Sequence, residues 1–135
     1  MDQINIIGAI VGGLLAFVIG GLWYSPLLFG KIWAKAAGLT EEQIKSASMP
    51  KMLMITVPAS LIAALVFAAF LGREAGVVFG AGVGFAAGAF WVGTSLAISY
   101  TFEQRPASLL WVNGAYHTVQ FTVYGLAIGI ANSLM

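Results

Sequence analysis

A row of polar side chains marks the last apolar stretch of the chain, residues 108–132. Positions 113, 117, 120 and 124 repeat at intervals of four, three and four, so a helix presents them on one face. The row consists of Asn113, His117, Gln120 and Tyr124, with Tyr116 beside it. Amides and hydroxyls in this arrangement can hydrogen-bond between helices, and histidine titrates unaided near neutral pH.

Two interpretations of His117 stay open. Counted along the helix, it lies about 14 Å into a hydrocarbon layer of about 30 Å. Ionisable side chains at that depth are functional candidates, but a neutral His117 bonded to Ser95 or Tyr116 would be structural. For Asn113 and Gln120 we favour interhelical hydrogen bonds. Because such a row is costly against lipid, we expect it to face other helices or a water-filled space.

A second polar stripe, Trp91, Ser95 and Ser99, lies in the preceding apolar stretch, residues 76–100. Both stripes approach the connection at residues 101–107, where they could meet. That connection holds Glu103 and Arg105, whose charges could pair. The candidate binding or pathway residues are therefore Asn113, Tyr116, His117, Gln120, Trp91, Ser95 and Glu103.

The chemistry available to these residues is restricted. One histidine cannot form a bis-histidine haem site within a chain, and alone it makes a poor metal site. The absence of cysteine excludes disulfides and thiolate ligands. Acid–base work by His117 with Glu103 would need a re-entrant turn or an inward tilt. We expect no catalytic residues, no metal and no cofactor.

The elements that must position these residues follow from composition. The chain has 135 residues, of which 60% are hydrophobic and 8% charged. Soluble domains carry about 25% charged residues, so a soluble domain is excluded. Four stretches lack Asp, Glu, Lys and Arg and have the length of a membrane span: residues 4–24, 52–71, 76–100 and 108–132. We predict an all-α membrane protein: four transmembrane helices in a compact bundle, forming one domain over residues 1–135.

The segment at residues 25–51 is expected to be ordered. Ser25 and Pro26 resemble a helix N-cap and first residue, and Gly38 a stop. The apolar stripe between them predicts a short interfacial amphipathic helix on the cytoplasmic side. Thr40 and Gln43 form a capping box for a second short helix.

Orientation follows from the basic residues. Four spans place both termini on the side of Arg73, and the other side holds Lys31, Lys35, Lys45, Lys51 and Arg105. The positive side should be cytoplasmic, so both termini are predicted outside the inner (plasma) membrane. Met1, Asp2 and Gln3 give no positive region, so we expect no cleaved signal peptide.

Small residues recur every four positions in each span, as in GxxxG packing. In the first and third stretches they are Gly8, Gly12, Ala16 and Gly20, and Gly76, Gly80, Gly84 and Gly88. These ridges either pack the monomer or form at least one subunit contact. Because four short helices enclose little volume, we expect a homo-oligomer with cyclic symmetry.

Two segments resemble a known family. Residues 21–33, GLWYSPLLFGKIW, followed by GLTEE at 38–42, are similar to the opening of the prokaryotic membrane family "domain of unknown function 1761". Phe102-Glu103 and the segment NGAYH at 113–117 resemble its second motif. The resemblance implies a small four-helix inner-membrane protein and brings no established reaction. It directs attention to Trp23, Tyr24, Pro26, Phe29, Gly30, Trp33, Glu103, Asn113, Tyr116 and His117.

Three functions remain open at this point. The polar row favours an oligomeric channel or transporter-like protein for a small solute, ion or proton. The small-residue ridges favour a structural or regulatory membrane subunit, with an unidentified membrane partner. A lipid-facing enzyme would use Glu103, Tyr116 and His117. The lipid bilayer is the expected environment, and a net charge of +1 gives no field for nucleic acid.

Overall fold

A computed structural model describes residues 3–135; Met1 and Asp2, two of the residues behind the prediction of no cleaved signal peptide, lie outside the described residues. The described chain is all-helical, as the sequence predicts. Its elements are α1 (Ile6–Trp23), α2 (Gly30–Ala37), α3 (Glu41–Ser46), α4 (Met49–Leu71), α5 (Val77–Ala86), the π-helix η1 (Ala87–Val92), α6 (Gly93–Phe102) and α7 (Ala107–Leu134).

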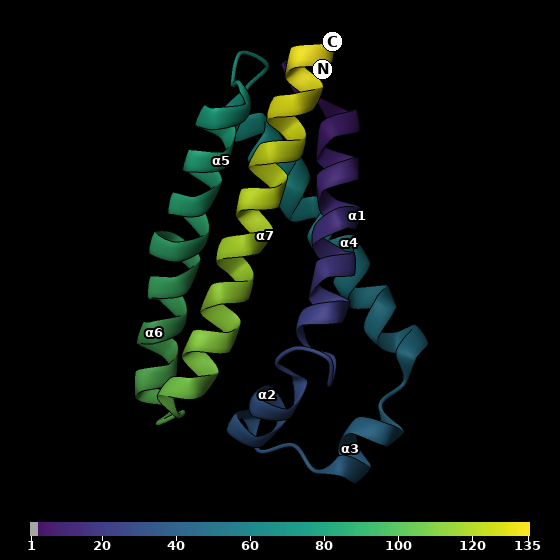
Figure 1. The fold of residues 1–135 in the computed structure, drawn as a ribbon, viewed down its shortest axis with the longest axis vertical. Helices are drawn as coiled ribbons and strands as arrows, with labels where there is room; N and C mark the ends of the chain where they lie inside the picture. The colour runs from purple at the N-terminus through teal and green to yellow at the C-terminus, as the bar shows by residue number, and fades with distance from the viewer. Residues whose placement is uncertain (1–2) are drawn as a thin grey trace.

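Helix α7 lies at the centre of the fold. It packs against α1 on one side and against α5, η1 and α6 on the other, and it also contacts α2 and α4 (Figure 1). Helix α4 packs mainly on α1. The termini lie together at one end of the molecule, and α2 and α3 lie at the other (Figure 1). The polar row of α7 is therefore carried by the helix with the most neighbours.

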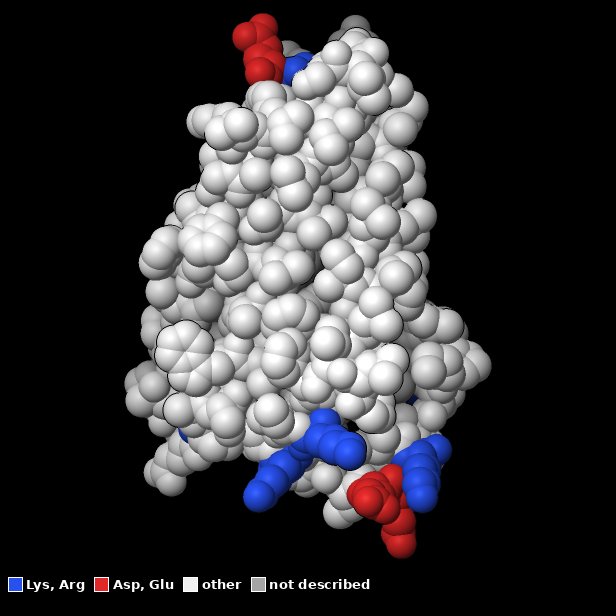
Figure 2. Space-filling model, viewed as in Figure 1, with Lys and Arg blue, Asp and Glu red and all other residues white. Residues whose placement is uncertain are grey.

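Three helices are long and apolar enough to cross a membrane: Ile6–Trp23, Met49–Leu71 and the continuous helix Val77–Phe102. Helix α7 has 28 residues and no charged side chain, but its polar row lowers its mean hydropathy and it is not among the three. Large apolar side chains cover the outside of the bundle, as expected in lipid. Figure 2 shows this uncharged surface between two charged ends.

Glycines set the contact between α5 and α7. A Cβ on Gly80 would overlap the Gly125 carbonyl, and one on Gly84 would overlap the Phe121 carbonyl. At Gly129 a Cβ would lie 2.7 Å from the Gly76 carbonyl oxygen. The two backbones therefore touch along several turns, which is the close approach that small residues permit in membranes. This part of the small-residue pattern packs the monomer.

Helix α1 uses its glycines in two directions. A Cβ on Gly12 would lie 3.2 Å from the Tyr124 Cα of α7, and one on Gly13 would lie 3.3 Å from the Leu61 Cα of α4. The buried core is accordingly rich in alanine, with Tyr124 and Ile128 as its largest fully buried apolar side chains.

The segment between the first two long helices differs in detail from its prediction. Helix α2 begins at Gly30 and not at Pro26, because residues 25–29 form a turn in which the Ser25 carbonyl accepts from the Gly30 amide at 2.9 Å. Gly38 ends α2 in the left-handed conformation, and the capping box of Thr40 and Gln43 is present. Helix α4 begins at Met49, three residues before the predicted stretch at 52–71, with Pro50 in its first turn.

A π-helical segment interrupts the third long helix. The π-helical hydrogen bonds of η1, Ala87–Val92, span five residues instead of four, and the added residue rotates α6 relative to α5. An added residue turns a helix face by about 100°. The glycine ridge of α5 therefore faces α7, while the stripe of Trp91, Ser95 and Ser99 is exposed.

Candidate functional site

The two segments that carry the family resemblance lie against each other, at the end of the bundle that holds α2. The Trp23 Nε1 donates to the Val112 carbonyl at 3.0 Å, and the Tyr24 hydroxyl donates to the Asn113 Oδ1 at 2.6 Å. The Asn113 Nδ2 donates to the Tyr100 hydroxyl at 2.7 Å. One amide of α7 thus joins the end of α1 to α6.

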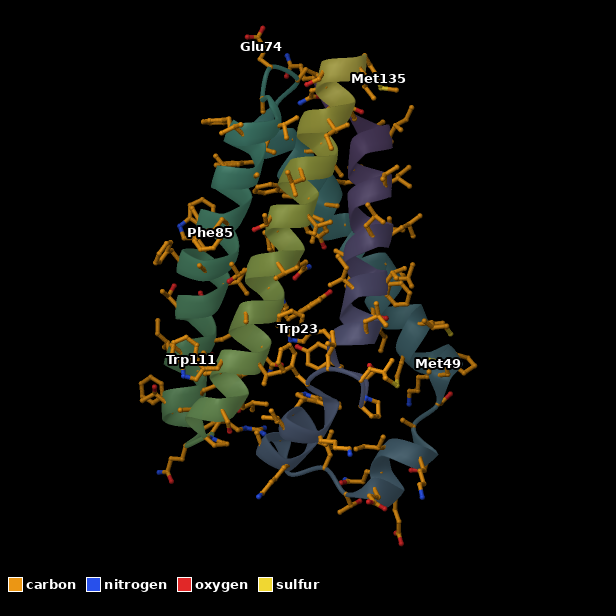
Figure 3. The ribbon with its side chains drawn as sticks, in the orientation of Figure 1. Trp23, Met49, Glu74, Phe85, Trp111 and Met135 are labelled. Carbon is orange, nitrogen blue, oxygen red and sulfur yellow. The ribbon has the colours of Figure 1, made fainter. Side chains whose placement is uncertain are left out.

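Aromatic rings surround this junction. Five of them form what we call the aromatic cluster: Trp23, Tyr24, Phe29, Trp33 and Tyr116. Ring centroids lie 4.7 Å apart for Trp23 and Phe29, 5.1 Å for Tyr24 and Trp33, and 5.5 Å for Tyr24 and Tyr116. Figure 3 shows Trp23 between the end of α1 and α7, whereas Trp111 points away from the bundle. Each such pair contributes about 0.5–1.5 kcal/mol beyond its buried area.

The turn before α2 places two of these rings. A Cβ on Gly30 would lie 2.5 Å from the Tyr24 carbonyl oxygen, so glycine lets the chain fold back onto the end of α1. The Phe29 amide donates to the Trp23 carbonyl at 3.0 Å, which closes the turn. Pro26 is exposed within it and fixes its own φ. The residues named by the first motif therefore build one local structure.

Tyr116 is held by α1. Its hydroxyl donates to the Ala16 carbonyl at 2.9 Å. A Cβ on Gly20 would lie 2.8 Å from that hydroxyl oxygen, so the glycine leaves room for the bond. The Tyr116 ring also lies 5.2 Å from the His117 ring, centroid to centroid.

His117 begins a chain of hydrogen bonds through the core. Its Nδ1 lies 2.5 Å from the Gln120 Oε1, and the Gln120 Nε2 donates to the Tyr124 hydroxyl at 2.6 Å. The Tyr124 and Ser60 hydroxyl oxygens are 2.9 Å apart, and the Ser60 hydroxyl donates to the Gly13 carbonyl at 2.8 Å. The polar face of α7 therefore binds α4 and α1 and is directed into the bundle.

The remaining candidate residues lie elsewhere. Trp91 is exposed, with its ring 5.9 Å from that of Phe70, and Ser95 is exposed on α6. Glu103 lies in the exposed α6–α7 turn, where its Oε1 accepts from the Arg105 Nε at 3.1 Å. The two polar stripes therefore do not meet, and no tilt brings Glu103 to His117. The rotation at η1 is the physical reason, and it places Tyr100 beside Asn113 instead.

A second polar contact lies at the other end and was not predicted. The fully buried Asn5 donates from Nδ2 to the Asn132 Oδ1 at 3.0 Å, and its Oδ1 accepts the Gly8 amide. The Asn132 Nδ2 donates to the carbonyls of Gly72 and Ala75. An asparagine just before a long helix predicts the cap at Asn5. Its bond to Asn132 could not be predicted, because no local sequence pattern indicates a long-range partner.

Two open grooves border α7. The first, of about 370 Å³, lies between α4 and η1 and is almost wholly apolar. Its lining residues are Ala63, Val66, Phe67, Phe70, Ala87, Trp91 and Phe121. The second, of about 510 Å³, lies on the outer face of α6 and α7. Among residues 3–135, no three His, Asp or Glu side chains gather as a metal site.

These features define a class: an all-helical protein with helices of membrane-spanning length and a polar network on a central helix. The chain belongs to the DUF1761 family, a family of proteins of unknown function whose model matches residues 7–129. The predicted resemblance is therefore confirmed, and both motif segments lie within the match. No curated protein and no solved structure matches the chain.

Proposed function

We propose that this chain is a multi-pass protein of the inner membrane with four spans, of which α7 is the fourth. A helix of 28 residues is about 42 Å long, which exceeds a hydrocarbon layer of about 30 Å. Its position between α1 and α5 over their whole length supports the same assignment (Figure 1). Helix α2 would then lie at the interface between lipid and water.

Charge supports the orientation of these spans. Most Lys and Arg residues lie at the end that carries α2 and α3, while Arg73 and Glu74 lie at the opposite end (Figure 2). The positive-inside rule makes the α2 end cytoplasmic and both termini external. Because the chain has no cysteine, Ser46→Cys and Glu74→Cys give clean probes. An impermeant maleimide should label Glu74→Cys in intact cells and Ser46→Cys after lysis; the reverse pattern would contradict the orientation.

Within the membrane, we propose a structural or regulatory subunit that works by assembly. The observation that carries this proposal is the direction of the α7 hydrogen bonds: Asn113, Tyr116 and Tyr124 all bond to residues outside α7. A network of this kind fixes the shape of the helices. The outer face remains apolar and grooved, which suits contact with copies of the chain or another membrane protein.

The mass of the detergent-extracted particles tests assembly. Cross-linking in native membranes, followed by extraction in a mild detergent and light scattering, should give particles larger than one chain of 14.1 kDa. A stoichiometric second membrane protein in those particles would identify the hetero-assembly. Uniform monomers, before and after cross-linking, would overturn the proposal.

A second candidate is a pathway for a small solute, ion or proton, formed where subunits meet. The observation that favours it is the second nitrogen of His117, which no hydrogen bond within residues 3–135 uses. Liposomes containing the purified protein should then pass protons or a small solute faster than empty liposomes, and His117→Ala should remove that flux. Flux equal to that of empty liposomes, or unchanged in His117→Ala, would exclude this candidate.

A further inference from the structure

The imidazole of His117 has one nitrogen bound and one available. Since the Gln120 Nε2 donates to Tyr124, the Gln120 carbonyl oxygen faces the Nδ1 of His117. A carbonyl oxygen accepts, so Nδ1 carries the proton of the neutral ring and Nε2 presents a lone pair. Within residues 3–135, no buried polar side-chain atom lacks a partner, so Nε2 is at an accessible surface. The network therefore holds an acceptor ready for a donor from outside the chain.

The hydrogen bonds of Tyr124 and Ser60 fix the tautomer of the His117 ring. The Ser60 hydroxyl proton goes to the Gly13 carbonyl, so the Tyr124 hydroxyl donates to Ser60 and accepts from Gln120. Every bond in the chain thus runs in the same direction, from His117 towards α1. Gln120, Tyr124 and Ser60 are positioning residues, because they orient the ring while Nε2 faces away from them.

The apolar groove between α4 and η1 borders the face of α7 that carries His117, since its wall residue Phe121 follows four residues later, a rise of about 6 Å. The π-helix lies at the same level, because a Cβ on Gly88 would overlap the His117 carbonyl. Single π-turns are frequent at functional sites. Here the π-turn places Ala87 and Trp91 in the groove wall.

We propose that this groove and His117 bind a neutral lipid alcohol, with the hydroxyl donating to Nε2 and the hydrocarbon chain in the groove. The donor must be neutral, since bringing an ammonium group to this depth is costly. The tail must be apolar, since Phe67, Phe70 and Trp91 line the space. A volume of about 370 Å³ suits a slender chain, and the groove is open to lipid. This inference goes beyond the proposed function and does not depend on it.

The test uses the only histidine of the chain as a reporter. Protein labelled with ¹⁵N-histidine in lipid nanodiscs is titrated with farnesol, and with farnesyl methyl ether as the control that lacks the donor. Farnesol should shift the Nε2 resonance in a saturable way, from a starting spectrum of the Nδ1–H tautomer, and the ether should not. Equal shifts from both probes, no shift, or an Nε2–H tautomer would overturn the proposal.

Groove variants give a second arm that leaves the histidine intact. Ala63→Leu fills the groove and should weaken farnesol binding at least tenfold, while keeping the Nδ1–H tautomer. Ala69→Leu, exposed on the same helix outside the groove, should leave binding within twofold of the unchanged protein. Equal affinities for the two variants would show that the groove does not hold the ligand. Neither binding experiment measures assembly or flux, so a negative result would contradict the lipid-alcohol site and not the proposed function.

Discussion

At the end that carries the termini, two asparagine side chains join the bundle, whereas at the end that carries α2 aromatic rings and the Asn113 amide make the joint. Asn5 and Asn132 bind each other and the carbonyls of the α4–α5 loop. At the other end, every residue from Met49 to Ala59 except Val57 is exposed, so the first half of α4 has little contact with its neighbours. The terminal end is closed, and the α2 end is less closely packed.

The two ends should also differ in rigidity. Glycine contacts between the α5 and α7 backbones lie towards the closed end, and a short loop connects α4 to α5 there. Elements with few buried contacts unfold locally at a lower free-energy cost than closely packed elements. We therefore expect α2 and the first half of α4 to exchange more readily than α5 and α7. Four pairs of substitutions test this contrast.

The largest effect is expected from Gly125→Ala. Its Cβ would overlap the Gly80 carbonyl, so α5 and α7 must separate at the closed end, at a cost of more than about 2 kcal/mol. Gly114→Ala on the same helix meets open space and should gain a few tenths of a kcal/mol, or about 1 at most, from helix propensity. Unfolding in sodium dodecyl sulfate, followed by circular dichroism, measures both. Similar stabilities would argue against the backbone contact.

Tyr124→Phe should have the next largest effect. It removes a hydroxyl that binds both Gln120 and Ser60 in the core, which should cost about 1–2 kcal/mol in the same assay. Tyr100→Phe removes a half-buried hydroxyl at the α2 end and should cost about 0.6 kcal/mol or less. A larger loss for Tyr100→Phe would reverse the contrast between the ends.

Asn132→Ala and Asn113→Ala compare the two polar joints. Each should cost about 1 kcal/mol, because each amide binds two partners. The two variants should differ in where hydrogen exchange increases. It should rise at residues 72–76 in Asn132→Ala and in α2 in Asn113→Ala. Uniform changes over the whole chain in both variants would mean that the ends are not separate units.

The smallest change in overall stability is expected from Gly30→Ala. The added Cβ displaces the turn before α2, so exchange protection of α2 should fall, with about 0.5 kcal/mol or less lost from the whole protein. Gly21→Ala has no neighbour within 4 Å and should leave α2 protected. If Gly30→Ala unfolds the protein, α2 is part of the central packing and not a local structure at the α2 end.

Much of this fold is predictable from sequence because lipid permits few structures. Uncharged stretches predict the bounds of the long helices to within a few residues. Capping residues such as Thr40 and Gly38 predict where the short helices begin or end. The glycine spacing predicts close packing, but which ridge meets which depends on the whole bundle. The polar row lowers the mean hydropathy of α7, so hydropathy does not identify this helix as a span.

The candidate site is predictable only in part. The shared face of Asn113, His117 and Gln120 follows from helical spacing, and the structure directs it into the bundle. The π-turn has no simple signal in the sequence, so its rotation of α6 could not be foreseen, and the expected meeting with Ser95 does not occur. Ser60 and Tyr100 were missed as partners because long-range pairing depends on tertiary packing.

We propose that α7 crosses the membrane with its polar row turned towards protein. Spin labels on single cysteines along residues 115–130, in liposomes, test it through collisions with oxygen and with an aqueous nickel chelate. We predict a low collision rate with the nickel chelate at every position. The collision rate with oxygen should be lowest at positions 120, 124 and 128 and highest at 126 and 130. High nickel access along the segment, or oxygen maxima on the polar row, would contradict the account.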